Sequence, residues 1–130
     1  MDIKNLEAVD CFITKDGSEI RELLAHRNSV IRHQSLAEAR LPAGGATQEH
    51  YHPLTEEIYY ITHGVGEIRI EGETRPVRVG DAIAIPPGQR INCGTPARER
   101  CACSVAARRL MNTRTPSSPN RELTCSGTVV

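Results

Sequence analysis

The sequence predicts an all-β protein, a sandwich or small barrel with little helix. Short apolar stretches with a two-residue alternation follow one another from about residue 35 to residue 105, and glycine or proline separates them. The chain has 130 residues, of which 38% are hydrophobic, so it suits one domain with a modest core. Within it we expect an N-terminal lead-in over residues 1–33, a barrel over residues 34–105 and a tail over residues 106–130.

The lead-in is expected to form a strand region or a short helix. Its most helix-like stretch is residues 18–25, where Ser18 is suited to cap a first turn. Arg21 stands where a glutamate would complete the capping box. The stretch is short, so a single turn or a strand remains open.

In the barrel region, alternation and turn residues predict a succession of short strands. Turns are expected at four glycine-containing sites, namely Gly64-Val65-Gly66, Glu71-Gly72, Gly80-Asp81 and Pro86-Pro87-Gly88. Strands are expected between and around them, over residues 35–41, 46–52, 57–62, 67–70, 75–79, 82–85 and 101–105. Residues 91–95 are expected to form a compressed loop.

The tail is polar and basic, contains no aromatic residue, and is rich in serine, threonine and proline from Asn112 onward. Such a segment cannot bury enough apolar surface to offset the entropy of ordering it, so we expect it to be flexible. A basic tail that binds an acidic partner is the less favoured alternative.

Composition argues against several classes of function. The 16 basic and 16 acidic side chains balance, and aromatic residues are 3% of the chain, so we expect no nucleic-acid partner. No apolar run reaches the roughly 20 residues of a membrane-spanning helix, so we expect no membrane association. The N-terminus lacks the basic and apolar regions of a secretion signal, which predicts a cytoplasmic protein. The five cysteines, an odd number, argue against a disulfide framework.

The densest group of chemically active side chains lies between residues 44 and 66. His50 and His52 are two residues apart, so on a strand they would project from the same face. Glu57 begins the next predicted strand, and its neighbour Glu56 would point to the opposite face. Two imidazoles and one carboxylate form a good donor set for a first-row transition metal. A solvated histidine pair on a surface strand is the alternative, because a His-x-His pair alone is a weak signal.

The frame around these residues resembles the first motif of the cupin superfamily. That motif reads Gly, five residues, His-x-His, three or four residues, Glu, six residues and Gly. Every position is matched here, by Gly44, His50, His52, Glu57 and Gly64. The resemblance favours the metal-binding interpretation of the histidine pair.

The second cupin motif is matched only in its first half. It reads Gly, five residues, Pro-x-Gly, two residues, His, three residues and Asn, and Gly80, Pro86 and Gly88 fit it. Ile91 stands where the family has its fourth ligand, a histidine, and Asn92 lies closer than the asparagine of the motif. These departures all follow Gly88, so a diverged or truncated C-terminal segment would account for them together.

The resemblance implies a double-stranded β-helix, a jelly-roll barrel with a metal or small-ligand site inside. By resemblance His50, His52 and Glu57 are the metal ligands, and the ion is divalent: iron, manganese, nickel or zinc. The partner is then a small polar ligand or substrate, and the protein is expected to be a homodimer. Oxygenase, decarboxylase and isomerase chemistries all occur on this fold, which does not choose among them. A non-catalytic binding protein with a degenerate metal site is the alternative, and no catalytic base is identifiable.

The alternation from Glu57 places three further side chains, and the turn at Pro86-Pro87-Gly88 places a fourth. His63 would share the face of Glu57 but lie about 20 Å along the strand, so we expect it at the rim of the barrel. Tyr59 shares that face and either lines the cavity or packs in the core, whereas Tyr60 faces outward. Arg90 is expected at the barrel mouth, where it either clamps a carboxylate or is solvated.

Overall fold

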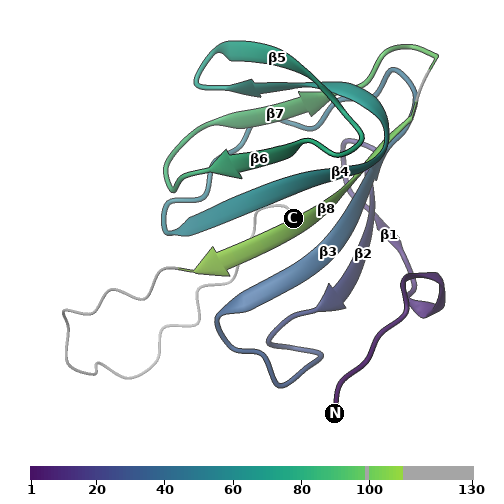
Figure 1. Ribbon diagram of the computed structural model, residues 1–130, viewed down its shortest axis with the longest axis vertical. Helices are drawn as coiled ribbons and strands as arrows, with labels where there is room; N and C mark the ends of the chain where they lie inside the picture. Colours follow the sequence, from purple (N-terminus) through teal and green to yellow (C-terminus); the bar gives the residue numbers. More distant parts are fainter. Residues whose placement is uncertain (99, 110–130) are drawn as a thin grey trace.

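Eight β-strands and one short 3-10 helix form the described part of the chain in a computed structural model (Figure 1). The structure describes residues 1–98 and 100–109. The all-β prediction is confirmed, and no helix in these two ranges is long and apolar enough to cross a membrane. In chain order the elements are η1 (Leu6–Ala8), β1 (Phe12–Ile13), β2 (Glu19–Leu24), β3 (Gln34–Leu41), β4 (Thr55–Ile70), β5 (Glu73–Arg78), β6 (Ala82–Ile85), β7 (Ile91–Gly94) and β8 (Cys101–Arg109).

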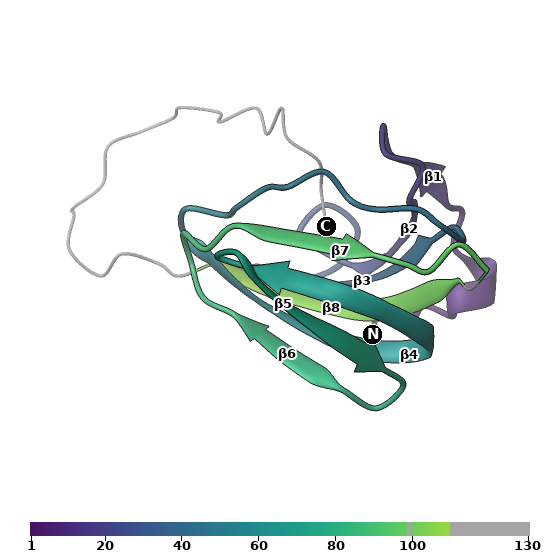
Figure 2. The same ribbon diagram turned by 90° about the horizontal axis from the view of Figure 1, so that it is seen from above.

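Strand β4 belongs to both layers of the barrel. Its first half pairs with β8 and β6, and its second half pairs with β5 and β7, all in antiparallel register. Strands β3, β2 and β1 extend the first layer beyond β8. Figures 1 and 2 show β4 curving from one layer into the other. The two layers therefore face each other across an interior that β4 lines along its length.

The interior is apolar because side chains alternate along each half of β4. Tyr59, Ile61 and Ile68 point inward and are at most 5% exposed, whereas Ile58 and Tyr60 point outward and are 52% and 48% exposed. Burial of such apolar surface is the main favourable contribution to folding. The inward residues of β4 form one cluster with side chains from four other strands: Val77, Ile85, Ile91 and Cys101.

A bulge in β4 replaces the turn that we predicted at Gly64-Val65-Gly66. The pairing with β8 shifts by one residue between Ile61 and His63, and Gly64 has a φ of 75°. A Cβ on residue 64 would overlap the carbonyl oxygen of Arg100, so glycine is required there for space as well as for backbone conformation. The strand bends at these glycines instead of ending.

Three other predicted elements differ from the structure. Residues 18–25, the most helix-like stretch, contain strand β2, because their alternating side chains pair with β3 and bury Ile20. Residues 46–52 are not a regular strand and form only isolated bridges to β7, at Ala46 and His50. Strand β7 occupies most of the stretch that we expected to be a compressed loop.

The predicted turns at Glu71-Gly72 and Gly80-Asp81 are confirmed. Glu71, Gly72 and Gly80 have φ values of 48°, 85° and 93°, and each turn joins two strands that are consecutive in the chain. The closing strand β8 continues to Arg109, past the end at residue 105 that we expected. From residue 110 onward the tail lies outside the described residues, so its flexibility stays a prediction.

Ile61→Ala should lower the free energy of unfolding by about 2–5 kcal/mol, the range for truncating a buried isoleucine to alanine. Ile58→Ala, on the opposite face of β4, should lower it by about 1 kcal/mol or less. Urea unfolding of the two variants and the wild type measures both changes. Equal losses would contradict the alternation that places Ile61 inside.

Candidate metal centre

His50 and His52 lie on the segment that joins β3 to β4, and β7 holds this segment in place. The backbone N–H of His50 donates to the carbonyl of Ile91 at 3.0 Å, and the N–H of Ile91 donates to the carbonyl of His50 at 2.8 Å. Closer to β3, the N–H of Thr47 donates to the carbonyl of Cys93 at 2.8 Å, and the N–H of Cys93 donates to the Thr47 hydroxyl oxygen at 2.9 Å. The segment is thus fixed against β7 although it is not a regular strand.

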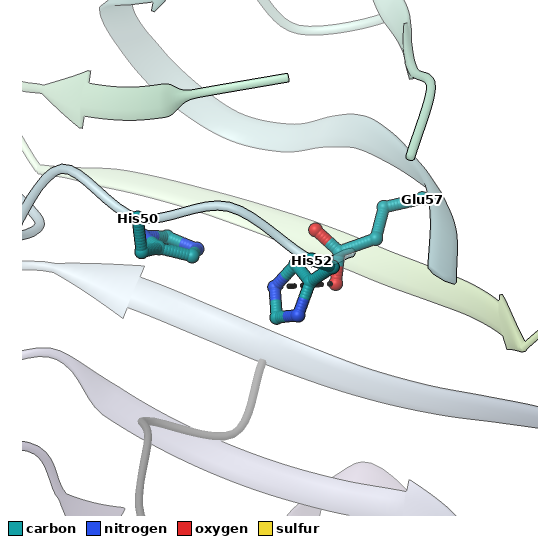
Figure 3. Close-up of side chains that lie close together, drawn as sticks. All are labelled: His50, His52 and Glu57. Carbon is teal, nitrogen blue, oxygen red and sulfur yellow. Dashed lines mark ion pairs between the residues drawn. The ribbon is translucent and has the colours of Figure 1, made fainter. Parts of the chain in front are cut away.

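One ring nitrogen of His50 forms a hydrogen bond with the backbone. Its Nδ1 lies 2.8 Å from the carbonyl oxygen of Gln48, and since a carbonyl only accepts, we assign the proton to Nδ1. Nε2 then has a free lone pair, which is the form that coordinates metals. The ring of His52 stands edge-on to the ring of His50, with their centroids 5.3 Å apart (Figure 3).

Glu57 enters the site from the beginning of β4. It pairs with Ile85 of β6 and Ala107 of β8, so it lies within a sheet, and it is 2% exposed. Figure 3 shows its carboxyl group facing His52, whose Nε2 lies 3.4 Å from Oε1 of Glu57. Ligand atoms of His50, His52 and Glu57, one from each, all lie within 4.8 Å of one another. The register of β4 and the hydrogen bonds of the histidine segment to β7 therefore bring the three residues together.

The polar atoms of this cluster are buried and unsatisfied. In the described part of the chain, no hydrogen bond of acceptable geometry reaches Nε2 of His50, Nε2 of His52 or either carboxyl oxygen of Glu57. Leaving a buried polar group unpaired costs about 1–3 kcal/mol. Converging nitrogen and oxygen atoms without other partners suit a divalent transition metal, so the cluster could hold a metal ion.

Burial sets the charge of the cluster. It raises the pKa of Glu57 from 4.5 to about 7, so that the carboxyl group is about half protonated at neutral pH without a metal. Burial also lowers the pKa of His52, and repulsion from His50 lowers it further. His52 is therefore chiefly neutral near pH 7, so its contact of 3.4 Å with Glu57 is not an ion pair. Neutral imidazoles and a carboxyl group that loses its proton near neutrality suit metal binding.

Ile91 occupies the position at which the second cupin motif has its fourth ligand, a histidine. His50 and Ile91 are opposite each other in a hydrogen-bonded antiparallel pair, so their side chains project to the same side. Ile91 is 1% exposed and belongs to the apolar cluster of the core. A metal held here would have three protein donors, and its other coordination positions would be open to a second ligand.

Four of the other candidate side chains point away from the cluster or pack elsewhere. Glu56 is exposed on the opposite face of β4, as the register predicts. Tyr59 packs in the core, and Tyr60 faces outward. The side chain of Arg90 is 66% exposed, and its Nη1 lies 3.7 Å from a carboxyl oxygen of Glu49. The structure favours the solvated alternative for this arginine.

His63 is exposed at the bulge of β4 and does not join the cluster. It lines a separate cavity of about 450 Å³ near the start of β8. The charged side chains that line this cavity with it are Glu19, Glu38, Arg40 and Arg100. Its exposure agrees with the rim position that we expected.

Two side chains help to position the histidine segment, and no site pattern that we used predicts this role for either of them. Asn92 donates through Nδ2 to the carbonyl oxygen of Thr47, which fixes the segment to β7. Asp16 accepts a hydrogen bond from the backbone N–H of Gln48 at 3.1 Å. The asparagine of the second motif gave a signal for Asn92, but not for its role. Asp16 lies 32 residues from its partner, and no local pattern points to it.

The fold and the cluster together define the class of protein. Residues 37–103 match the cupin domain family, and this chain belongs to that family. The matched stretch contains all three residues of the cluster and runs from β3 into β8.

Individual relatives extend this result. An uncharacterized protein of Methanocaldococcus jannaschii is 50% identical over 76 residues, which are 58% of this chain and 61% of that protein. Polyketide synthase CurC of Streptomyces cyaneus is 31% identical over 90 residues, 69% of this chain and 56% of that protein. The chain therefore spans somewhat more than half the length of these relatives. The polyketide cyclase RemF from Streptomyces resistomycificus has a similar fold, with a TM-score of 0.73 over 87% of each chain at 22% identity.

Glu57→Gln should stabilise the metal-free protein at alkaline pH relative to the wild type. The pKa of Glu57 in the folded protein lies above its ordinary value, so its contribution to stability is complete below about pH 4.5 and is lost as the pH rises through about 7. Glutamine does not titrate, so the stability of the variant relative to the wild type should rise by up to about 3 kcal/mol between these two limits. Urea unfolding with a chelator present, repeated across this pH range, measures the difference.

Glu56→Gln is the matched control for this pH series, because Glu56 is exposed. Its stability relative to the wild type should change little with pH. If the stability of Glu57→Gln relative to the wild type also changed little with pH, that result would contradict the raised pKa of Glu57.

Proposed function

We propose that this protein binds one divalent metal ion through Nε2 of His50, Nε2 of His52 and the carboxylate of Glu57, and presents it to a small polar molecule. The observation that carries the proposal is the convergence of these buried ligand atoms within 4.8 Å, with no hydrogen bond to them from the described residues. Membership of the cupin family supports it.

The donor set favours a transition metal. Two imidazoles and one carboxylate suit iron, manganese, nickel or zinc, whereas calcium and magnesium prefer oxygen ligands throughout. An ion of this kind, when bound, polarises an oxygen atom of the molecule that it binds. Glu57 contributes negative charge, the carbonyl of Gln48 keeps Nε2 of His50 unprotonated, and the buried side chain of Ile91 keeps water away from one side.

The open positions favour a small molecule with two neighbouring oxygen atoms. With three protein donors, a hydroxy acid or a dicarbonyl compound is able to bind through both oxygens. CurC is named as a polyketide synthase and RemF as a polyketide cyclase, and polyketides carry oxygen atoms in such an arrangement. For this chain we infer an oxygenase, decarboxylase or isomerase type of reaction on such a molecule.

A non-catalytic binding protein is the second candidate, and Ile91 is the observation that favours it. A buried isoleucine in place of a fourth ligand weakens the hold on a metal, and a site without metal still offers polar atoms to a small molecule. Turnover of an oxygen-rich acid that stops on chelation supports the enzyme. Binding of that acid without turnover, unaffected by chelation, supports the second candidate.

The proposal includes a second copy of the chain as partner. Ile58 and Tyr60 project from the outer face of β4 and lie opposite Ala84 and Ala82 of β6, which are exposed as well. Together they form a continuous apolar patch, of the kind that an interface covers. The cytoplasmic location stays a prediction from the sequence.

Metal titration of single variants tests the site. His50→Ala and His52→Ala should each lower the affinity for whichever of the four metals binds best by about 100-fold or more, because one of three donors is lost. Glu57→Gln should lower it strongly, because the only anionic donor is removed. Glu56→Gln is the matched control and should leave the affinity within about twofold. Calorimetry gives each value.

Two outcomes of that titration would contradict the site. Equal losses in the two glutamate variants would refute the register of β4. Undiminished binding in both histidine variants would refute the site itself.

Ile91→His should raise the metal affinity by about tenfold or more, because an imidazole would join His50 on the same side of the pair that the two residues form. The same replacement at Cys93, the next residue of β7 on that face, serves as the control for an added histidine further from the cluster. Calorimetry with the metal of the wild type compares them. An affinity that does not change in Ile91→His, in a variant that folds normally, would show that the side chain of residue 91 does not reach the metal.

A further inference from the structure

Asp16 lies in the turn between β1 and β2 and links this turn to the histidine segment. Its Oδ1 accepts three hydrogen bonds within the turn, from the hydroxyl of Thr14 at 2.6 Å and from the N–H and the hydroxyl of Ser18 at 3.1 and 2.7 Å. Its Oδ2 accepts instead from the backbone N–H of Gln48 at 3.1 Å. The turn orients the carboxylate, which uses its second oxygen to hold a distant segment.

Gln48 connects Asp16 to the candidate metal centre through its backbone. Its N–H is held by Asp16, and its carbonyl oxygen receives the Nδ1 proton of His50 at 2.8 Å. A residue held at its N–H has less freedom to rotate its own carbonyl, so the two hydrogen bonds are coupled. Without a partner at Nδ1, a neutral histidine is free to carry its proton on Nε2 instead.

We propose that Asp16 is a positioning residue for the candidate metal centre, which keeps His50 in the tautomer with a bare Nε2 by holding the Gln48 backbone. The inference rests on the proposed function. Asp16 lies outside the site and controls the protonation of one donor atom, Nε2 of His50. Outer hydrogen bonds commonly fix a ligating histidine in this way.

The environment of Asp16 suits this role. Burial acts to raise the pKa of its carboxyl group, but hydrogen bonds from Thr14, Ser18 and Gln48 outweigh burial and hold that pKa below the usual range. The group is therefore a carboxylate at neutral pH, and hydrogen bonds to a charged acceptor are stronger than those to a neutral one. The histidine segment is thus held both by β7 and by a charged acceptor.

Asp16→Asn tests the link, because the amide has one acceptor oxygen where the carboxylate has two. Asp16→Ala removes every hydrogen bond of the side chain. Asp81→Asn is the matched control, since Asp81 also accepts a backbone N–H in a turn, that of Arg78 at 2.9 Å, at the end of β6 away from the cluster. The tautomer of His50 is read from the ¹⁵N shifts of its ring nitrogens without metal, at about pH 8. Metal affinity is measured on the same variants by calorimetry with Zn(II) and Mn(II).

We expect both Asp16 variants to show a larger fraction of the Nε2–H tautomer of His50 and a metal affinity lowered about 10- to 100-fold. Asp81→Asn should change neither. Unchanged tautomers and affinities in both Asp16 variants would overturn the proposal, and so would an equal change in Asp81→Asn. If the wild type binds neither Zn(II) nor Mn(II) here and neither Fe(II) nor Ni(II) in the titration of the site, the proposed function fails, while the tautomer measurement still decides the role of Asp16. If one Asp16 variant does not fold, the other decides.

Discussion

Strand β4 runs through both sheets, so its two-residue alternation decides which side chains enter the barrel along most of its length. The same alternation that buries Tyr59 and Ile61 also carries Glu57 inside, at the first buried position of the strand, and the bulge shifts the pattern so that Ile68 points inward as well. A shift of one residue would bury Glu56 and expose the core. One register of β4 therefore decides both the packing of the apolar cluster and the position of the carboxyl group. The burial of the apolar side chains stabilises this register and so keeps the carboxyl group inside.

That placement has an energetic cost in the metal-free protein. Four polar atoms of the cluster are buried without hydrogen bonds from the described residues, and the carboxyl group is driven toward its protonated form. Folds commonly tolerate such groups where a function requires them, because perturbed ionisation and unsatisfied polar atoms concentrate at functional sites. The four atoms lie beside the beginning of β4, while the apolar cluster around Ile91 and Ile61 stabilises the interior.

The sequence predicted the all-β class and the alternation of Glu56 and Glu57, because a period of two is a local property. It missed the bulge at Gly64, since glycines that permit a turn also permit a strand to bend, and the choice depends on the carbonyl of Arg100 across the sheet. The spacing of His50 and His52 suggested a strand, but the segment is held by scattered bonds to β7. The link from Asp16 to Gln48 spans 32 residues, so only the folded chain brings these groups together. Local patterns thus predicted the three residues of the cluster, and long-range contacts determine their orientation.

X-ray absorption spectroscopy at the edge of the bound metal tests the central claim most directly, because it identifies the donor atoms themselves. The protein is loaded with the metal that calorimetry selects, at a pH above the pKa of Glu57 of about 7. We expect a first shell of nitrogen and oxygen atoms, with the outer-shell scattering of two imidazole rings, and loss of one ring in His50→Ala. A sulfur atom in the first shell, contributed by a cysteine such as Cys101, or a spectrum without imidazole scattering would contradict it.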